Sequence, residues 1–127
     1  MTDPRIEKLV CLSTAHITPS SLSLLEQDEF DGLIFYSKVD SADGNCYGGF
    51  LFVDRGCYFR KTTRLLTEQI EPTPDFNELP IDLQLLVSFA DAYEIDWLMF
   101  DRDEPRYDGL RTYEEEWRKY DSYGLDN

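Results

Sequence analysis

The stretch Leu79–Asp103, LPIDLQLLVSFADAYEIDWLMFDRD, decides the fold of this 127-residue chain. Its first half repeats an apolar residue every four positions: Ile81, Leu85, Phe89 and Tyr93. That spacing matches the period of a helix and puts these side chains on one face. Pro80 marks the start, because the first turn of a helix leaves its N–H groups unbonded in any case. We predict a helix over 80–93, covered by neighbours on more than one side.

Two short apolar runs predict interior strands. Ile95–Phe100 has no charge after Asp96 and is rich in bulky side chains, and Asp101 begins the following loop. Leu9–Leu12 is a similar run near the start of the chain, and its polar residues begin at Ser13. Both runs suit strands buried inside a sheet.

The segments between these runs supply the other elements. Thr18 followed by Pro19 is a helix start signal, because the hydroxyl can cap the first turn and proline presets φ. Leu33–Val39 and Gly48–Val53 flank a loop rich in turn formers, which predicts two antiparallel strands. Cys57–Leu66 fits either a third strand or a short helix.

The predicted order is strand, helix, two strands, one undecided segment, helix, strand. This order predicts a single α/β domain over 1–127, with a mixed four- to five-stranded sheet and two main helices. Aromatic residues punctuate the end of the chain, so we expect the part through Trp117 to pack on the core. We expect 118–127 to form a frayed tail.

Composition limits the function and the cellular setting. The chain has 26 acids, 12 bases and a net charge of −14, which disfavours direct binding to nucleic acid or to anionic membranes. A basic partner is the natural complement. Three cysteines without a paired framework, and the lack of a signal peptide or long apolar run, predict a cytoplasmic protein with reduced thiols. We expect Cys11 to be a small core residue.

The negative charge is unevenly spread. Residues 67–104 contain eleven acids and one base, whereas 55–64 contain four bases and no acid. Carboxylates gathered on one side could imitate a phosphate backbone and bind the Lys and Arg patch of a nucleic-acid-binding protein. A solvated acidic surface that merely keeps the protein soluble is the alternative. The candidate contacts are Glu68, Glu71, Asp75, Glu78, Asp82, Asp91 and Glu94.

A rival hypothesis is an enzyme or metal site. His16 is the one histidine of the chain and follows the first predicted strand, and Asp101 and Asp103 follow the last one. If the two strands were parallel neighbours, these side chains would gather at one sheet edge. They could bind a divalent ion or act as a general base with its orienting acid, with Ser13 or Thr14 as a nucleophile or hydroxyl ligand. Each group also has a structural alternative. The His16 ring could hydrogen-bond the turn after the first strand, and Asp101 and Asp103 could be a loop pair that an ion pair with Arg102 or Arg106 closes.

Several segments resemble a family of uncharacterised small proteins of bacteria, plasmids and phages. They are Ser13-Thr14-Ala15-His16-Ile17 with Thr18-Pro19, Leu79-Pro80-x-Asp82-Leu83 with Phe89-Ala90, Asp96–Asp103, and Leu110, Thr112, Tyr113 and Trp117. The resemblance supports the α/β fold and implies no cofactor and no known chemistry. It also implies a mobile genetic element, and such elements often encode inhibitors of restriction or CRISPR defence. We therefore expect an inhibitor of a host nucleic-acid-binding defence system.

A third hypothesis is self-association through aromatic residues on and beside the middle strands: Phe50, Phe52, Tyr58 and Phe59. Aromatics of this kind are more often core, and the net charge of −14 opposes close approach of two copies. We expect a monomer or a weak homodimer.

Overall fold

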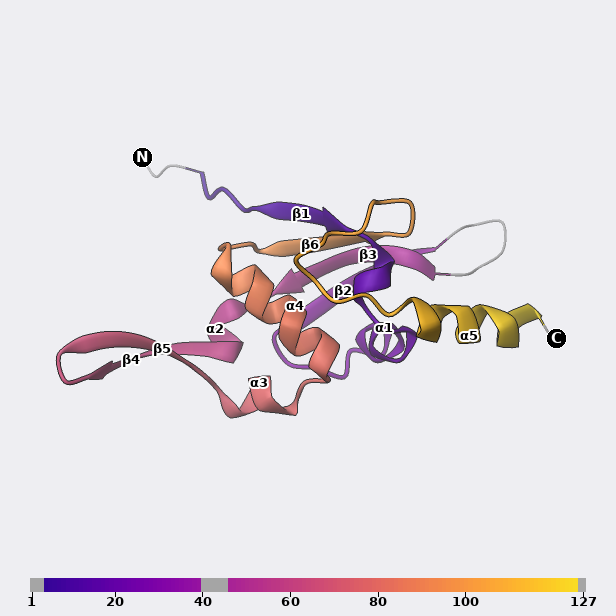
Figure 1. The fold of residues 1–127 in the computed structure, drawn as a ribbon. Helices are drawn as coiled ribbons and strands as arrows, with labels where there is room; N and C mark the ends of the chain where they lie inside the picture. The colour runs from indigo at the N-terminus through magenta and orange to yellow at the C-terminus, as the bar shows by residue number, and fades with distance from the viewer. Residues whose placement is uncertain (1–3, 40–45, 126–127) are drawn as a thin grey trace.

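A computed structural model describes residues 4–39 and 46–125 of the chain (Figure 1). In chain order the elements are β1 (Leu9–Leu12), η1 (Thr14–His16), α1 (Pro19–Glu26), β2 (Leu33–Val39), β3 (Cys46–Val53), α2 (Arg55–Tyr58), β4 (Phe59–Arg64), β5 (Thr67–Pro72), α3 (Pro74–Glu78), α4 (Ile81–Ala92), β6 (Trp97–Asp101) and α5 (Glu114–Leu125). The α/β class and the mixed four-stranded sheet are confirmed. No helix in the described ranges is both long and apolar enough to cross a membrane.

The central sheet has the strand order β1-β6-β3-β2. β1 and β6 run parallel, whereas β3 is antiparallel to both β6 and β2. The first and last predicted strands are therefore parallel neighbours, which was the condition for a site at their shared edge. β1 and β2 form the two edges of this sheet.

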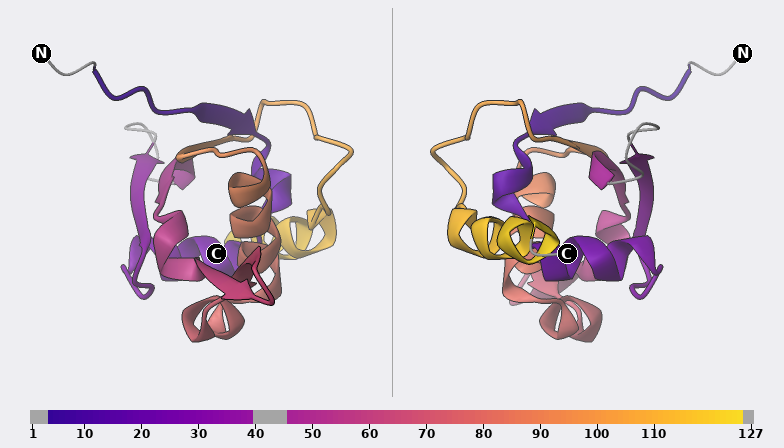
Figure 2. Two further views of the ribbon diagram at one scale, coloured as in Figure 1. Left: turned by 90° about the vertical axis from the view of Figure 1, so that its left-hand side faces the viewer. Right: turned by 90° about the vertical axis from the view of Figure 1, so that its right-hand side faces the viewer.

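All the described helices lie on one side of this sheet (Figures 1 and 2). The core forms between them from Leu12, Ile17, Leu22, Leu25, Leu33, Leu51, Val53, Leu83, Leu86, Val87, Leu98 and Phe100. α4 has its predicted span, but its apolar row is not the buried one: Ile81 and Leu85 are 61% and 42% exposed. The expected cover on more than one side is confirmed, because α4 also contacts α2, its Asp82 accepts from Ser21 of α1, and its Phe89 packs on Tyr107.

The segment Cys57–Leu66, which fitted either a strand or a short helix, contains the end of a helix and a strand. Arg55–Tyr58 forms the helical turn α2, and the chain then enters β4, which pairs with β5 in a hairpin separate from the main sheet. The sequence analysis predicted neither β5 nor α3. The hairpin projects from the domain (Figure 1), and its two turn residues Leu65 and Leu66 are 98% and 99% exposed.

The segment after β6 returns to the start of the chain. The amide of Tyr113 donates to the carbonyl of Ala15 at 2.7 Å, and the indole of Trp117 donates to the carbonyl of Ile17 at 2.7 Å. The expected packing of Trp117 against the core is confirmed. Beyond Trp117, α5 continues to Leu125, within the stretch for which a frayed tail was expected.

Candidate functional site

The main sheet has an apolar face that no described helix covers. Side chains alternate along a strand, so the residues between the core positions point to the opposite face. The strand register places them in two rows across the sheet. The first row is Leu9, Trp97, Phe52 and Ile34, and the second is Cys11, Met99, Phe50 and Tyr36. We call these eight residues the open sheet face.

The open sheet face combines exposure with aromatic packing. Tyr36, Leu9, Ile34 and Phe50 are 57%, 49%, 47% and 39% exposed. The Trp97 ring lies 5.1 Å from the Phe52 ring and 6.1 Å from the Tyr36 ring, measured between centroids. None of the eight carries a formal charge at pH 7. Contiguous exposed apolar surfaces are in general typical of protein–protein contact sites, because water leaves them favourably when a partner covers them.

Cys11 belongs to this face and not to the core. Its side chain is exposed, so the prediction of a small core residue is wrong. The cause is the alternation of the strand: Val10 and Leu12 point toward the helices, and Cys11 points away from them. An apolar run by itself does not say which of its residues are covered.

The candidate catalytic histidine holds the fold together. His16 is 2% exposed and both of its ring nitrogens have backbone partners. The amide of Tyr107 donates to Nε2 at 2.9 Å, and Nδ1 lies 3.0 Å from the carbonyl of Arg111. This arrangement requires the neutral ring with its proton on Nδ1, because Nε2 accepts and a carbonyl can only accept. His16 thereby anchors the segment between β6 and α5.

The other groups of the rival site are also engaged locally. Asp101 Oδ1 accepts from the amide of Asp103 at 2.9 Å, which closes a turn after β6. Ser13 is buried, and its hydroxyl accepts from the amide of Ala15 at 3.1 Å. In the part of the chain that the structure describes, no three His, Cys, Asp or Glu residues lie close enough to hold a metal ion. β1 and β6 are parallel neighbours as the hypothesis required, but the His16 ring hydrogen-bonds the segment after β6.

Asp82 corrects the list of candidate partner contacts. It is 4% exposed, because its carboxylate caps the turn that begins α1. Oδ2 accepts from the amide and the hydroxyl of Thr18 at 2.9 and 3.0 Å, and Oδ1 accepts from the hydroxyl of Ser21 at 2.7 Å. Asp82 is therefore a structural clamp between α4 and α1, and a partner cannot reach it.

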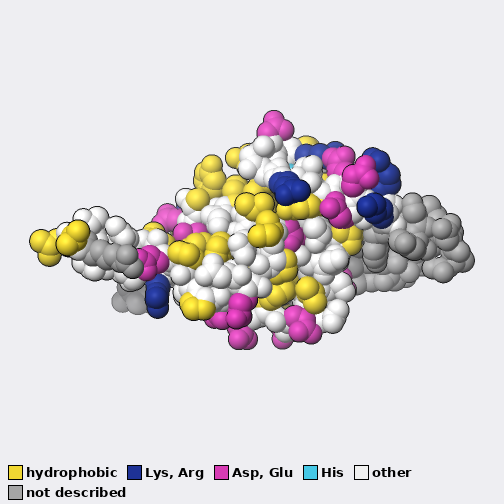
Figure 3. All heavy atoms as spheres, turned by 60° about the horizontal axis from the view of Figure 1, so that its bottom comes forward, with side chains coloured by type: hydrophobic (Ala, Val, Ile, Leu, Met, Phe, Trp, Pro, Cys, Tyr) yellow, Lys and Arg dark blue, Asp and Glu magenta, His cyan; other side chains and the backbone are white. Residues whose placement is uncertain are grey.

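The six remaining candidate acids are distributed over β5, α3, α4 and the turn after α4. Glu68 and Glu71 are on the hairpin, where Lys61 Nζ lies 3.8 Å from Glu68 and Arg60 is paired in register with Glu71. The others are Asp75 and Glu78 on α3, Asp91 on α4 and Glu94 after it. On the face shown in Figure 3, acidic side chains form small groups, with Lys and Arg beside several of them. Acidic side chains do not form one continuous band on that face.

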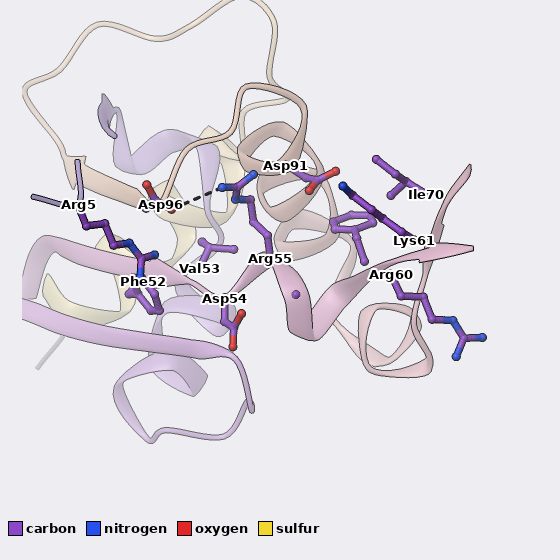
Figure 4. A pocket seen from close by; sticks show the side chains of 12 residues that line it. Arg5, Phe52, Val53, Asp54, Arg55, Arg60, Lys61, Ile70, Asp91 and Asp96 are labelled. Atoms are coloured by element: carbon purple, nitrogen blue, oxygen red, sulfur yellow. Dashed lines mark ion pairs between the residues drawn. The ribbon is translucent and has the colours of Figure 1, made fainter. Parts of the chain in front are cut away.

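A shallow pocket of about 300 Å³ is lined in part by basic residues of 55–64 (Figure 4). Arg55 lies 3.6 Å from Asp96, which joins α2 to the start of β6. Lys61 and Asp91 lie on facing sides of the same pocket. Arg55 and Lys61 thus lie beside acids of their own chain, which reduces the free positive charge on this side of the molecule.

Two neighbouring groups beneath the sheet have raised pKa values. Burial raises the pKa of the Tyr58 hydroxyl, which donates to the carbonyl of Asp31. Burial also raises the pKa of the Cys57 thiol, and the negative charges of Asp75, Asp54 and Asp31 raise it further. Cys57 is thus a poor nucleophile at neutral pH, because the reactive form of a cysteine is the thiolate.

The model of one protein family matches residues 9–115, which include β1, β6 and the whole open sheet face. The chain belongs to the DUF5983 family. The match is to the C-terminal domain of this family of unknown function. Neither a curated protein nor a solved structure matches the chain. DUF5983 membership therefore brings no assigned chemistry, and the function has to be argued from the surface described above.

Sequence reasoning singled out only Phe50 and Phe52 of the open sheet face, although a signal for the others was present. The runs Leu33–Tyr36, Phe50–Val53 and Trp97–Phe100 are apolar at consecutive positions. Such runs are typical of strands covered on both faces. Here the helices of this DUF5983 domain cover one face, so the other set of apolar side chains remains accessible.

Proposed function

We propose that this protein is a protein-binding module that docks its partner on the open sheet face. The observation that carries the proposal is the two-row apolar surface, with four side chains exposed by 39–57% and no described helix over it. Aromatic residues and methionine are enriched at the centres of protein interfaces. Tyr36, Phe50, Phe52, Trp97 and Met99 give this face that composition.

The chemistry of the partner follows from the charge of the whole chain. A net charge of −14 attracts a basic protein over long range and repels a second copy of this chain or an acidic protein. The complementary surface is an apolar patch ringed by Lys and Arg. We propose the more specific form that the partner is a nucleic-acid-binding host protein and that this protein inhibits it, supported by the net charge and by the resemblance to proteins of mobile elements.

The test is a capture experiment with a matched control. The tagged protein is compared with Tyr36→Ser/Phe50→Ser, which makes the open sheet face polar, and with Ile81→Ser/Leu85→Ser, which changes two exposed apolar residues on α4. We expect the native chain and the α4 variant to retain one basic protein in about 0.1 M salt, and the open-face variant to lose it. About 1 M salt, which shortens the Debye length to about 3 Å, should slow association.

Two further measurements separate the proposal from its competitors. Excess duplex DNA should displace the protein from a nucleic-acid-binding partner, whereas a partner of another kind should remain bound. Light scattering over a range of concentrations reports self-association. A dimer that the open-face substitutions convert to a monomer would show that a second copy covers this face, and it would overturn the proposal of a different partner.

A further inference from the structure

A groove of about 480 Å³ runs along the outer edge of β1. It is lined by β1, by α4 and by the segments that follow α4 and β6. The lining residues are Lys8, Leu9, Val10, Cys11, Leu12, Phe89, Tyr93, Ile95 and Tyr107. Apart from Lys8 and the hydroxyl groups of the two tyrosines, these side chains offer an apolar surface. The groove adjoins the open sheet face and shares Leu9 and Cys11 with it.

The backbone of β1 is available along this groove. The carbonyl of Lys8 accepts from the amide of Trp97 at 3.0 Å, so Lys8 faces β6. Alternate residues of a strand bond to the same neighbour, which places the polar backbone groups of Val10 and Leu12 toward β6 as well. Those of Leu9 and Cys11 therefore point away from β6 toward the groove. In the described sheet, no strand lies on that side of β1.

The aromatic residues of the groove are held in place by one another. The Phe89 ring lies 5.1 Å from the Tyr93 ring and 5.7 Å from the Tyr107 ring, measured between centroids. A hydrogen bond with the hydroxyl of Tyr93 raises the pKa of Tyr107, so these two side chains are also joined at their polar ends. The anchor of the Tyr107 segment is the bond from its amide to His16. The wall facing β1 is therefore formed before any ligand arrives.

We propose that this groove binds an extended segment of a protein partner, which adds to β1 as a fifth strand. A strand matches both features at once: its backbone bonds to Leu9 and Cys11, and alternate side chains enter the apolar groove. Acids next to the lining residues in sequence, Glu7, Glu94 and Asp108, favour a segment flanked by Lys or Arg. This inference rests on the proposed function, because it takes the partner to be a basic protein.

The probe is a fluorescein-labelled decapeptide with valine at alternate positions and lysine or threonine between them. Its control has the same composition in scrambled order and therefore the same charge. The protein variant is Cys11→Pro, which removes the outward N–H and leaves the bonds between β1 and β6 in place, because proline is tolerated on an edge strand with its nitrogen facing outward. Cys11→Val, which keeps the N–H, is the matched control.

We expect the alternating peptide to bind the native protein and Cys11→Val equally, and Cys11→Pro at least about tenfold more weakly. Equal binding of the scrambled peptide, or full binding by a folded Cys11→Pro, would overturn the strand-addition proposal. If Cys11→Pro does not fold, N-methylation of alternate amides of the peptide gives the same test. One of the two methylation patterns should abolish binding and the other should not.

The outcome is separable from that of the proposed function. Loss of partner capture by Tyr36→Ser/Phe50→Ser with unchanged capture by Cys11→Pro supports the open sheet face and rejects the groove. Capture that Tyr36→Ser/Phe50→Ser and Cys11→Val retain but Cys11→Pro loses supports the groove and rejects docking on the open sheet face.

Discussion

The two faces of the main sheet are made by the same four strands and both carry apolar side chains, yet they have different surroundings. On the covered face, Leu51 and Leu98 are 0% exposed and lie against helices. On the open face, their neighbours Phe50, Phe52, Trp97 and Met99 keep part of their surface in water. The covered face stabilises the folded chain, and the open face is free to stabilise a complex.

The strongest way to test this comparison is to shorten adjacent residues of β6. Leu98→Ala should cost about 2–5 kcal/mol of unfolding free energy, because it leaves a cavity in the core. Met99→Ala, on the open face of the same strand, should cost about 1 kcal/mol or less, since water can fill the space. Urea titration measures both. Equal costs would mean that the open face is covered.

A second prediction concerns the polar clamp that holds the helices on the covered face. Asp82→Asn should lower the unfolding free energy by about 1–3 kcal/mol, because asparagine has a single acceptor oxygen and cannot accept from both Thr18 and Ser21 as the two carboxylate oxygens do. Glu78→Gln, at an exposed position on α3, is the control and should change it by less than about 0.5 kcal/mol. An unchanged Asp82→Asn protein would contradict the structural role assigned to this carboxylate.

A third prediction extends the comparison to the hairpin tip. Leu65 and Leu66 have φ values of 50° and 65°, in the left-handed region that leucine adopts at a cost. Leu65→Asn with Leu66→Gly should raise the unfolding free energy by about 1–2 kcal/mol, because Asn-Gly suits the two-residue turn. Leu65→Val should lower it, since β-branched residues disfavour positive φ. Thermal melts with matched buffers provide the measurement, and a destabilised Asn-Gly variant would refute this account of the turn.

The smallest expected effect is a difference in thiol reactivity between Cys11 on the open sheet face and Cys57 on α2. At neutral pH a maleimide should label exposed Cys11 before half-buried Cys57. The raised pKa of Cys57 keeps its thiol protonated, so its labelling rate should continue to rise with pH beyond about 8.5, where an ordinary thiol levels off. Peptide mass spectrometry reads each site separately. A Cys57 rate that levels off near pH 8.5 would contradict the raised pKa.

Much of the architecture could be predicted from local patterns. Thr18 and Pro19 specify the start of α1 by capping and preset φ, and the helix begins at Pro19. The apolar runs at Leu9 and Trp97 predicted the two parallel strands. The hairpin was harder: its turn has leucines where glycine or asparagine would have signalled it, so β5 was not recognised.

The candidate sites depended on side-chain direction, and there the sequence was a weaker guide. His16 and Asp101 do follow parallel neighbouring strands, but His16 points to the backbone of Tyr107 and Arg111. Asp82 looked like one more surface acid, whereas its partners Thr18 and Ser21 lie far away in the chain. Contacts between distant segments decided both cases.

The sequence by itself determined the α/β class, the order of the main elements and the large negative charge, because these depend on composition and on short-range periodicity. The tertiary structure alone decided which apolar side chains were covered. The reason is physical: alternation assigns residues to two faces of a sheet, but only the placement of helices on one side makes that face a core and leaves the other exposed.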